Sequence, residues 1–142
     1  ETVNAKAHGI WYTYNELGQL KQMREVYGDT SVHTDYTYDV AGRIIEIESG
    51  NTNSKYRYDS FNRIAQQQAL HGTTKVLIQD ITYRSPASNS TSSQIIDWHC
   101  YNTNNFNLQF SYTYDANGNI LSVTSQGKTT RYFYDSANQY SS

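Results

Sequence analysis

Residues 112–120 read Tyr-Thr-Tyr-Asp-Ala-Asn-Gly-Asn-Ile, and this stretch decides the fold. The two tyrosines stand two residues apart, so on a β-strand their side chains share one face. Asp115 suits the first position of a type I turn, and Gly118 suits the left-handed residue that closes a hairpin with a bulge. Ile120 then begins a second apolar segment. The stretch therefore predicts a strand, a tight turn and a returning strand.

The same pattern, Tyr-x-Tyr followed by Asp or Asn, occurs five times and uses ten of the fourteen tyrosines. A degenerate sixth copy is Ile81-Thr82-Tyr83-Arg84. A unit that recurs every few tens of residues indicates a repeat architecture. We expect the paired tyrosines to build one stacked aromatic face. They are Tyr12, Tyr14, Tyr36, Tyr38, Tyr56, Tyr58, Tyr112, Tyr114, Tyr132 and Tyr134.

A residue that accepts positive φ follows three positions after each motif Asp or Asn. Glycine enters the left-handed region without steric cost, and asparagine is among the next most tolerant residues. These structural turn residues are Gly18, Gly42, Asn62, Gly118 and Asn138. A second glycine with polar neighbours, such as Gly28 or Gly127, predicts a further reversal at the far end of each hairpin. Turns at both strand ends predict an antiparallel meander.

The clearest single strand covers residues 106–114, where aromatic or aliphatic residues alternate with polar ones. Residues 17–26 could be drawn as a helix, but the repeat register favours a strand. We expect an all-β fold, an antiparallel β-hairpin meander of ten to twelve strands. Residues 1–142 form one array of about six units, with an irregular insertion near 84–105 that includes a polar loop around Pro86. The array resembles an excised piece of a longer repeat protein.

Composition and charge exclude several functions. The net charge of −2 gives no electrostatic footprint for nucleic acid, and no apolar run is long enough to insert into a membrane. Cys100 is the single cysteine, so the chain has no internal disulfide. His99 cannot activate Cys100 from the adjacent strand position, because neighbouring side chains point to opposite faces. We predict no enzyme activity, catalytic residue or cofactor.

Metal binding is also disfavoured by the sequence. The four histidines lack the spacing of metal ligands. The turn aspartates, such as Asp39 and Asp115, could be read as calcium ligands, but Asn15 occupies the same position in the first copy. Turn chemistry allows that exchange, whereas coordination that depends on charge does not. We expect no metal site.

The stretches 36–44 and 112–120 closely resemble the YD repeat of the Rhs family, which includes bacterial Rhs and wall-associated polymorphic toxins, Tc toxin B/C components and teneurins. The resemblance implies a segment of a spiral β-shell. It also implies a secreted or cell-surface protein, most often bacterial, whose shell encloses or presents a toxin or effector domain. The implied partners are adjacent repeats and that enclosed domain.

Two functions follow for this segment. The first is structural, as part of the shell wall. The alternative is a carbohydrate-binding module that attaches to cell-surface glycans through exposed tyrosines, because aromatic rings stack on sugar rings. The open edges of such a sheet also favour strand-to-strand self-association. The sequence leaves open which sheet face points inward.

Overall fold

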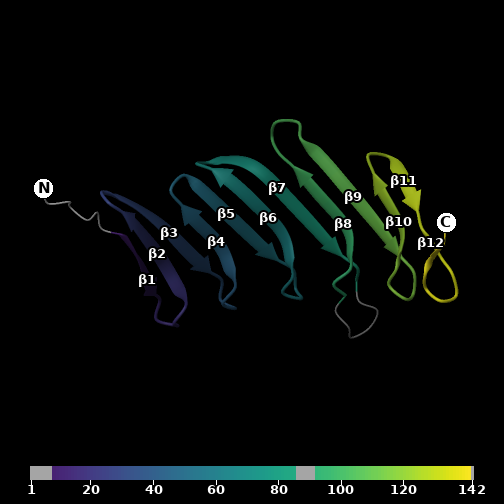
Figure 1. The fold of residues 1–142 in the computed structure, drawn as a ribbon, viewed down its shortest axis with the longest axis horizontal. Helices are drawn as coiled ribbons and strands as arrows, with labels where there is room; N and C mark the ends of the chain where they lie inside the picture. Colours follow the sequence, from purple (N-terminus) through teal and green to yellow (C-terminus); the bar gives the residue numbers. More distant parts are fainter. Residues whose placement is uncertain (1–7, 86–91, 142) are drawn as a thin grey trace, which may run out of the picture. The chain divides into compact units, whose positions relative to one another are not determined.

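The computed structural model describes residues 8–85 and 92–141, and its regular elements are β-strands. Figure 1 shows them following one another as hairpins. The expected loop around Pro86 lies largely outside the described residues. The strands are β1 His8–Tyr14, β2 Leu20–Tyr27, β3 Thr30–Tyr38, β4 Ile44–Ser49, β5 Thr52–Tyr58, β6 Ile64–His71, β7 Thr74–Tyr83, β8 Ile95–Tyr101, β9 Asn107–Tyr114, β10 Ile120–Ser125, β11 Lys128–Arg131, β12 Phe133–Tyr134 and β13 Tyr140–Ser141.

Strands β1 to β11 form one sheet in sequence order, and β12 pairs separately with β13. The strand pairs with a described register are all antiparallel. The predicted all-β hairpin meander is therefore confirmed. Residues 20–27 form strand β2, so the extended reading of that region is right, although the strand begins at Leu20 rather than at residue 17. Strand β9 begins one residue later than expected, at Asn107.

Two kinds of turn connect most of the strands. The motif turns, such as 15–19 and 115–119, connect the strands at one end of each hairpin. Two-residue loops connect them at the other end, where Gly28, Gly50 and Gly72 have φ between 57° and 61°. Positive φ at the first loop residue and not at the second is the mark of a type II′ turn. Gln126 and Gly127 both have positive φ, as a type I′ turn requires.

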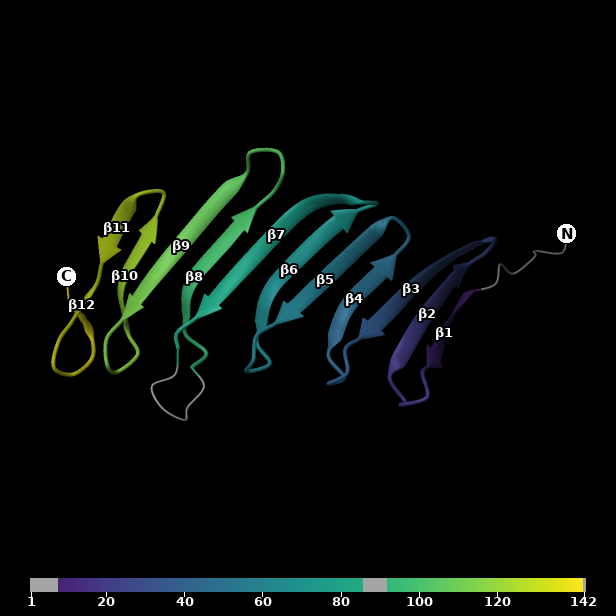
Figure 2. The same cartoon turned by 180° about the vertical axis from the view of Figure 1, so that it is seen from behind.

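The chain divides into two compact units. One contains Glu1–Arg57 with Gln68–Val76, and the other contains Tyr58–Gln67 with Leu77–Ser142. Strands β1 to β4 lie in the first unit and β8 to β13 in the second. Figure 2, seen from behind, shows β8, β9 and β10 as consecutive neighbours, in agreement with the pairing register.

The described strands have no second layer packed on them. Only Ile78 and Cys100 are buried hydrophobic residues within the described ranges, at 6% and 5% exposure. The chain exposes 10382 Å², whereas a compact protein of 16.3 kDa exposes about 7,500 Å². The chain therefore buries less surface than a compact protein of the same mass. Side chains between cross-strand neighbours, rather than a closed core, hold the sheet together.

Candidate functional site: the hairpin junctions

Each motif turn is built around the side chain of its Asp or Asn. In the turn at 115–119, Asp115 Oδ1 accepts hydrogen bonds from the backbone N–H groups of Asn117 and Asn119, both at 2.9 Å. Asp115 N–H also donates to the carbonyl of Asn119 at 3.0 Å, which closes the loop. The same pair of side-chain acceptor bonds occurs at Asn15, Asp39, Asp59 and Asp135.

The residue expected to take the left-handed conformation does so in every motif turn. The φ values are 77° at Gly18, 81° at Gly42, 63° at Asn62, 92° at Gly118 and 64° at Asn138. The two asparagines have a Cβ and still occupy this region, as their short polar side chains permit. The exchange of glycine and asparagine is thus explained by backbone conformation.

Arginine strengthens two of these turns. Arg43 donates from Nε to Asp39 Oδ2 at 2.7 Å, and its second guanidinium nitrogen lies 2.6 Å from the same oxygen. Arg63 makes the corresponding contacts with Asp59. The hydrogen bond from Arg43 and the turn N–H groups hold the pKa of Asp39 below its ordinary value, since they favour the charged carboxylate.

The lowered pKa of Asp39 makes the turn sensitive to acid. A depressed folded-state pKa contributes stability that is present above the unfolded pKa and is lost as pH falls through the folded pKa. Asp39→Asn retains the turn acceptor, as Asn15 shows, but cannot titrate. We expect Asp39→Asn to lose less stability than the parent chain between about pH 5 and pH 2, in urea unfolding curves. The matched control is Glu16→Gln at an exposed turn position, and equal acid sensitivity in Asp39→Asn and the parent chain would contradict the assignment.

A register shift lies next to the second tyrosine in four of the hairpins whose pairing is described, whereas β12 pairs with β13 without a shift. Tyr14 pairs with Leu20, although Thr13 already pairs with Gln22. Tyr38, Tyr83 and Tyr114 show the same one-residue shift opposite Ile44, Ile95 and Ile120. Such a bulge removes a residue from the regular ladder. A backbone carbonyl at this point needs another hydrogen-bond donor.

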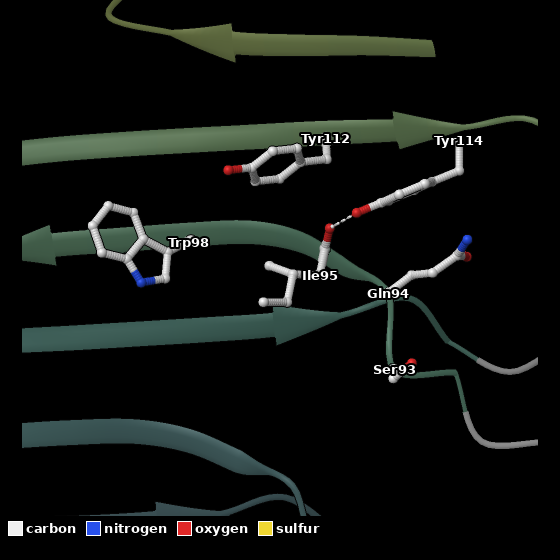
Figure 3. Close-up of a pocket in the computed structure, with 6 residues that line it drawn as sticks. All are labelled: Ser93, Gln94, Ile95, Trp98, Tyr112 and Tyr114. Carbon is white, nitrogen blue, oxygen red and sulfur yellow. Dashed lines mark hydrogen bonds between the residues drawn. The ribbon is translucent and has the colours of Figure 1, made fainter. Parts of the chain in front are cut away.

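The hydroxyl group of the next hairpin's tyrosine supplies that donor. Tyr38 donates to the carbonyl of Leu20 at 2.8 Å, and Tyr114 donates to that of Ile95 at 2.6 Å, as Figure 3 shows for the second pair. Tyr83 donates to Ile64 at 3.1 Å, and Tyr134 to Ile120 at 3.0 Å. Each acceptor is the first residue of the returning strand of its hairpin. We call this series of contacts the tyrosine ladder.

The tyrosine ladder begins where strand pairing between successive hairpins ends. Pairing of β2 with β3 stops at Gln22 and Asp35, and Tyr38 bridges the gap beyond them. Pairing of β8 with β9 likewise stops at Asp97 and Ser111, before the Tyr114 contact. The hydroxyl therefore joins hairpins at the end where their backbones separate. Burial, with a smaller effect of the neighbouring Tyr112, raises the pKa of Tyr114 and keeps its hydroxyl protonated as a donor.

A second series of contacts joins successive turns. The residue directly before the returning strand reaches the next turn along the sheet. Gln19 donates from Nε2 to the carbonyl of Gly42 at 3.5 Å, and Gln94 donates to that of Gly118 at 3.2 Å. Asn119 contacts the side chain of Asn138 in the same way. Each turn thus supports its neighbour.

The irregular connection between β7 and β8 retains the closing hydrogen bond of a motif turn and the contacts that join neighbouring turns. Arg84 N–H donates to the carbonyl of Gln94 at 2.8 Å, which is the closing bond of a motif turn. The Arg63 guanidinium donates to the carbonyl of Ser92 and lies 4.3 Å from the centroid of the Tyr83 ring. The insertion is therefore joined to a hairpin end that keeps its own ladder contact through Tyr83.

The exposure of the motif tyrosines depends on the strand that carries them. Tyr12 and Tyr14 on the edge strand β1 are exposed, and the other eight motif tyrosines are half-buried. Tyr12, Tyr36 and Tyr112 lie opposite Met23, Ile47 and Val123. Across these strand pairs the rings thus alternate with flexible or branched side chains, which differs from a column of tyrosines stacked on one another. Aromatic neighbours do occur locally, as at Phe110 and Tyr112.

An open hollow on the tyrosine face lies beside the ladder contact of Tyr114. Its volume is about 530 Å³, and Trp98, Tyr112 and Tyr114 line it together with Ile95, Gln94 and Ser93 (Figure 3). Trp98 and Phe110 pack with their ring centroids 5.9 Å apart. The hollow combines aromatic surfaces with the polar ends of two side chains.

Sequence reasoning missed two features of the junctions. One is the hydroxyl contact. The degenerate copy indicates it, because Tyr83 is kept although Ile81 replaces the first tyrosine and Arg84 replaces the aspartate. The other is that the turn after β8 is of the motif type, with Asn102 Oδ1 accepting from Asn104 and Phe106 and with Asn105 at φ 68°. The spacing Tyr101-Asn102-x-x-Asn105 could have identified it.

The other candidate sites considered from the sequence, a reactive cysteine and a metal site, are not formed by the described residues. Cys100 is buried between Gln79 and Leu108 on neighbouring strands, and burial raises the pKa of its thiol. Residues 8–85 and 92–141 contain no group of three or more His, Cys, Asp or Glu side chains placed to hold a metal ion. In the same ranges no helix has the length and apolar character needed to cross a membrane.

Comparison with known families agrees with the repeated junctions. The teneurin YD-shell family matches residues 2–90, and the RHS repeat family matches residues 114–142. The chain belongs to the Rhs/YD-repeat family. A search of curated proteins gave no match.

A solved structure shows the same fold for the YD-repeat chain. The crystal structure of TcdB2–TccC3–Cdc42 matches 94% of this chain with a TM-score of 0.66 and 17% sequence identity. The matched region is 7% of that chain, so the present chain corresponds to a small part of a much longer polypeptide. The YD-repeat chain and this Tc toxin structure therefore share the architecture of the sheet.

Proposed function

We propose that this YD-repeat chain is a wall segment of a secreted or cell-surface protein whose β-shell encloses or presents a toxin or effector domain. The observation that carries the proposal is a sheet that connects hairpin to hairpin by repeated junctions and that has, within residues 8–85 and 92–141, no second layer on either face. A wall needs lateral continuity and two free faces. A globular domain would instead bury one face under a second layer.

The two faces differ in chemistry, which supports a wall that separates two environments. The tyrosine face carries residues such as Tyr36 and Ile47. The opposite face carries carboxylates bound to amides on neighbouring strands, including Asp35 with Gln22 at 2.8 Å and Asp97 with Gln109 at 2.9 Å. Asp35 lies directly opposite Gln22, and Gln109 lies two residues from Ser111, which is opposite Asp97. Directly opposed residues, and those two positions further along a strand, share a face, so these pairs stay on one side of the sheet.

Cysteine labelling tests whether one face is enclosed. Val32→Cys places a thiol on the tyrosine face of β3, and Thr37→Cys places one on the opposite face of the same strand; both positions are exposed. In the isolated chain both thiols should react with a bulky polyethylene-glycol maleimide. In a complete protein that carries this segment, one of them should react at least about ten-fold more slowly, because the shell excludes the reagent.

The labelling experiment has an internal reference. Cys100 is 5% exposed and its thiol pKa is raised, so it should react slowly in both proteins. Equal reaction of Val32→Cys and Thr37→Cys in the complete protein would show that neither face is enclosed, and the proposal would then be wrong. The identity of the protected position would assign the inner face.

The hollow beside Tyr114 favours carbohydrate binding as a second candidate function. Trp98 and Tyr112 offer ring faces, and Gln94 and Ser93 offer polar partners for sugar hydroxyl groups. A glycan array followed by titration of tryptophan fluorescence tests it. Saturable binding that is lost in Trp98→Ala but retained in Trp11→Ala, which removes the exposed tryptophan of β1, would support it. Absence of binding across the array would count against it.

A further inference from the structure

The turn between β9 and β10 contains the pair Asn117-Gly118, and Asn-Gly occurs once in the chain (Figure 2). The corresponding pairs in the other Tyr-x-Tyr repeats are Leu17-Gly18, Ala41-Gly42, Phe61-Asn62 and Ala137-Asn138. The side-chain carbon of an asparagine lies within reach of the backbone nitrogen of the next residue. That nitrogen is most accessible when the next residue is glycine, because glycine has no Cβ to crowd it.

Both groups of this pair are weakly held in the structure. Asn117 is exposed, and its side-chain amide makes no hydrogen bond within residues 8–85 and 92–141. The neighbouring Asn119 amide, in contrast, donates to Asp115 Oδ2 at 2.8 Å. The Gly118 N–H donates to the carbonyl of Asp115 at 3.3 Å, whereas at the other four predicted turn residues this distance is 2.9–3.2 Å. Because N–H···O hydrogen bonds usually measure about 2.7–3.2 Å, the bond at Gly118 is the weakest of the five.

We propose that Asn117 is a site of spontaneous modification, at which the side-chain amide becomes a carboxyl group at a rate set by the turn. The Gly118 nitrogen gives its proton to a base in the solvent and attacks Asn117 Cγ. The new N–Cγ bond closes a five-membered imide, the Cγ–Nδ2 bond breaks, and Nδ2 leaves as ammonia. One water molecule then opens the imide at either carbonyl, which gives aspartate or isoaspartate. The net reaction consumes water and releases ammonia, with no oxidation or reduction.

The hydrogen bonds of the turn control the reaction. The imide ring includes the Cα–C bond of Asn117, so its closure changes the backbone rotation about that bond. Asp115 Oδ1 holds the backbone on both sides of this bond, because it accepts from the N–H groups of Asn117 and Asn119, both at 2.9 Å. The imide therefore forms in the fraction of molecules in which the turn is open. Local opening of this kind governs other reactions of exposed segments.

Isoaspartate lengthens the backbone of the turn by a methylene group. The spacing that lets one Asp115 oxygen accept from two N–H groups is then lost. The Gly118 carbonyl, which accepts from Gln94 Nε2 at 3.2 Å, moves with the altered backbone. The modification thus loosens the contact between neighbouring turns. This inference goes beyond the proposed wall function and does not depend on enclosure of either face.

Peptide mapping by mass spectrometry, on the chain before and after ageing in mildly alkaline buffer, tests the proposal. We expect Asn117 to be converted before the other asparagines, and an isoaspartate methyltransferase should label the same peptide. Asn117→Ala is the matched control, because Ala41 and Ala137 occupy the equivalent position. The aged parent chain should unfold at a lower urea concentration than the fresh chain, whereas Asn117→Ala should not change.

Two variants of Asp115 test control by the turn. Asp115→Ala removes both acceptor bonds, so conversion of Asn117 should become at least about ten-fold faster. Asp115→Asn keeps the acceptor, as Asn15 does in the first repeat, and should react at close to the parent rate. Circular dichroism checks folding, and Gln94→Ala is a milder variant that should also react faster than the parent. No conversion at Asn117, conversion spread evenly over the asparagines, or equal rates in Asp115→Ala and Asp115→Asn would each overturn the proposal.

Discussion

Gly118→Val should lower the free energy of unfolding by about 2 kcal/mol, as measured by urea denaturation. Gly118 has φ 92°, and a β-branched residue forced into this region costs about 1–3 kcal/mol. A Cβ at this position would also lie 2.9 Å from Gln94 Nε2. The amide would have to move away, which breaks its bond to the Gly118 carbonyl and weakens the contact between neighbouring turns.

A variant at Gly18 distinguishes the cost of backbone strain from the cost of displacing the Gln94 amide. Gly18 has φ 77°, but no atom lies within 4 Å of a Cβ built on it. Gly18→Val should therefore cost only the backbone strain, and less than Gly118→Val. Gly18→Asn should be close to neutral, since Asn62 and Asn138 already occupy the equivalent position. An unchanged melting temperature in both valine variants would contradict the assignment of these residues to the turns.

The hairpins could be predicted because their determinants are local. The alternation of residues around Phe110, the spacing from Asp115 to Gly118 and the exchange with Asn62 all act within a few residues of the chain. Strand type, turn position and positive φ follow from such patterns. The three-residue difference at the start of β2 is also local, because Leu17 remains in the turn and is 83% exposed.

The junctions were harder to predict because their partners lie in different hairpins. The bond from Tyr114 to Ile95 spans 19 residues, and the bond from Gln94 to Gly118 spans 24. A repeated tyrosine predicts a shared face but does not reveal that its hydroxyl meets a bulge carbonyl. Composition pointed to the aromatic rings as the source of burial. The structure shows that the second ring of the pair, at Tyr38, Tyr114 and Tyr134, also positions a donor where the strands separate.

The tyrosine ladder leads to the second large effect, which is expected for Tyr114→Phe. Loss of the hydroxyl leaves the Ile95 carbonyl without its donor at a half-buried site, so we expect a loss of about 1–2 kcal/mol in the free energy of unfolding. The ring and its packing stay in place, which restricts the change to one hydrogen bond. Differential scanning calorimetry and urea denaturation should agree on the direction.

Tyr112→Phe is the matched control for this effect. Tyr112 is two residues earlier on the same face, packs its ring against Phe110, and has no hydroxyl hydrogen bond in the described residues. Its variant should stay within about 0.5 kcal/mol of the parent chain. Tyr38→Phe, which removes the equivalent bond to Leu20, should repeat the loss seen for Tyr114→Phe. If the first and second tyrosines of the motif proved equally tolerant of phenylalanine, the rings alone would join the hairpins, and the bulge carbonyls would have to be satisfied by water.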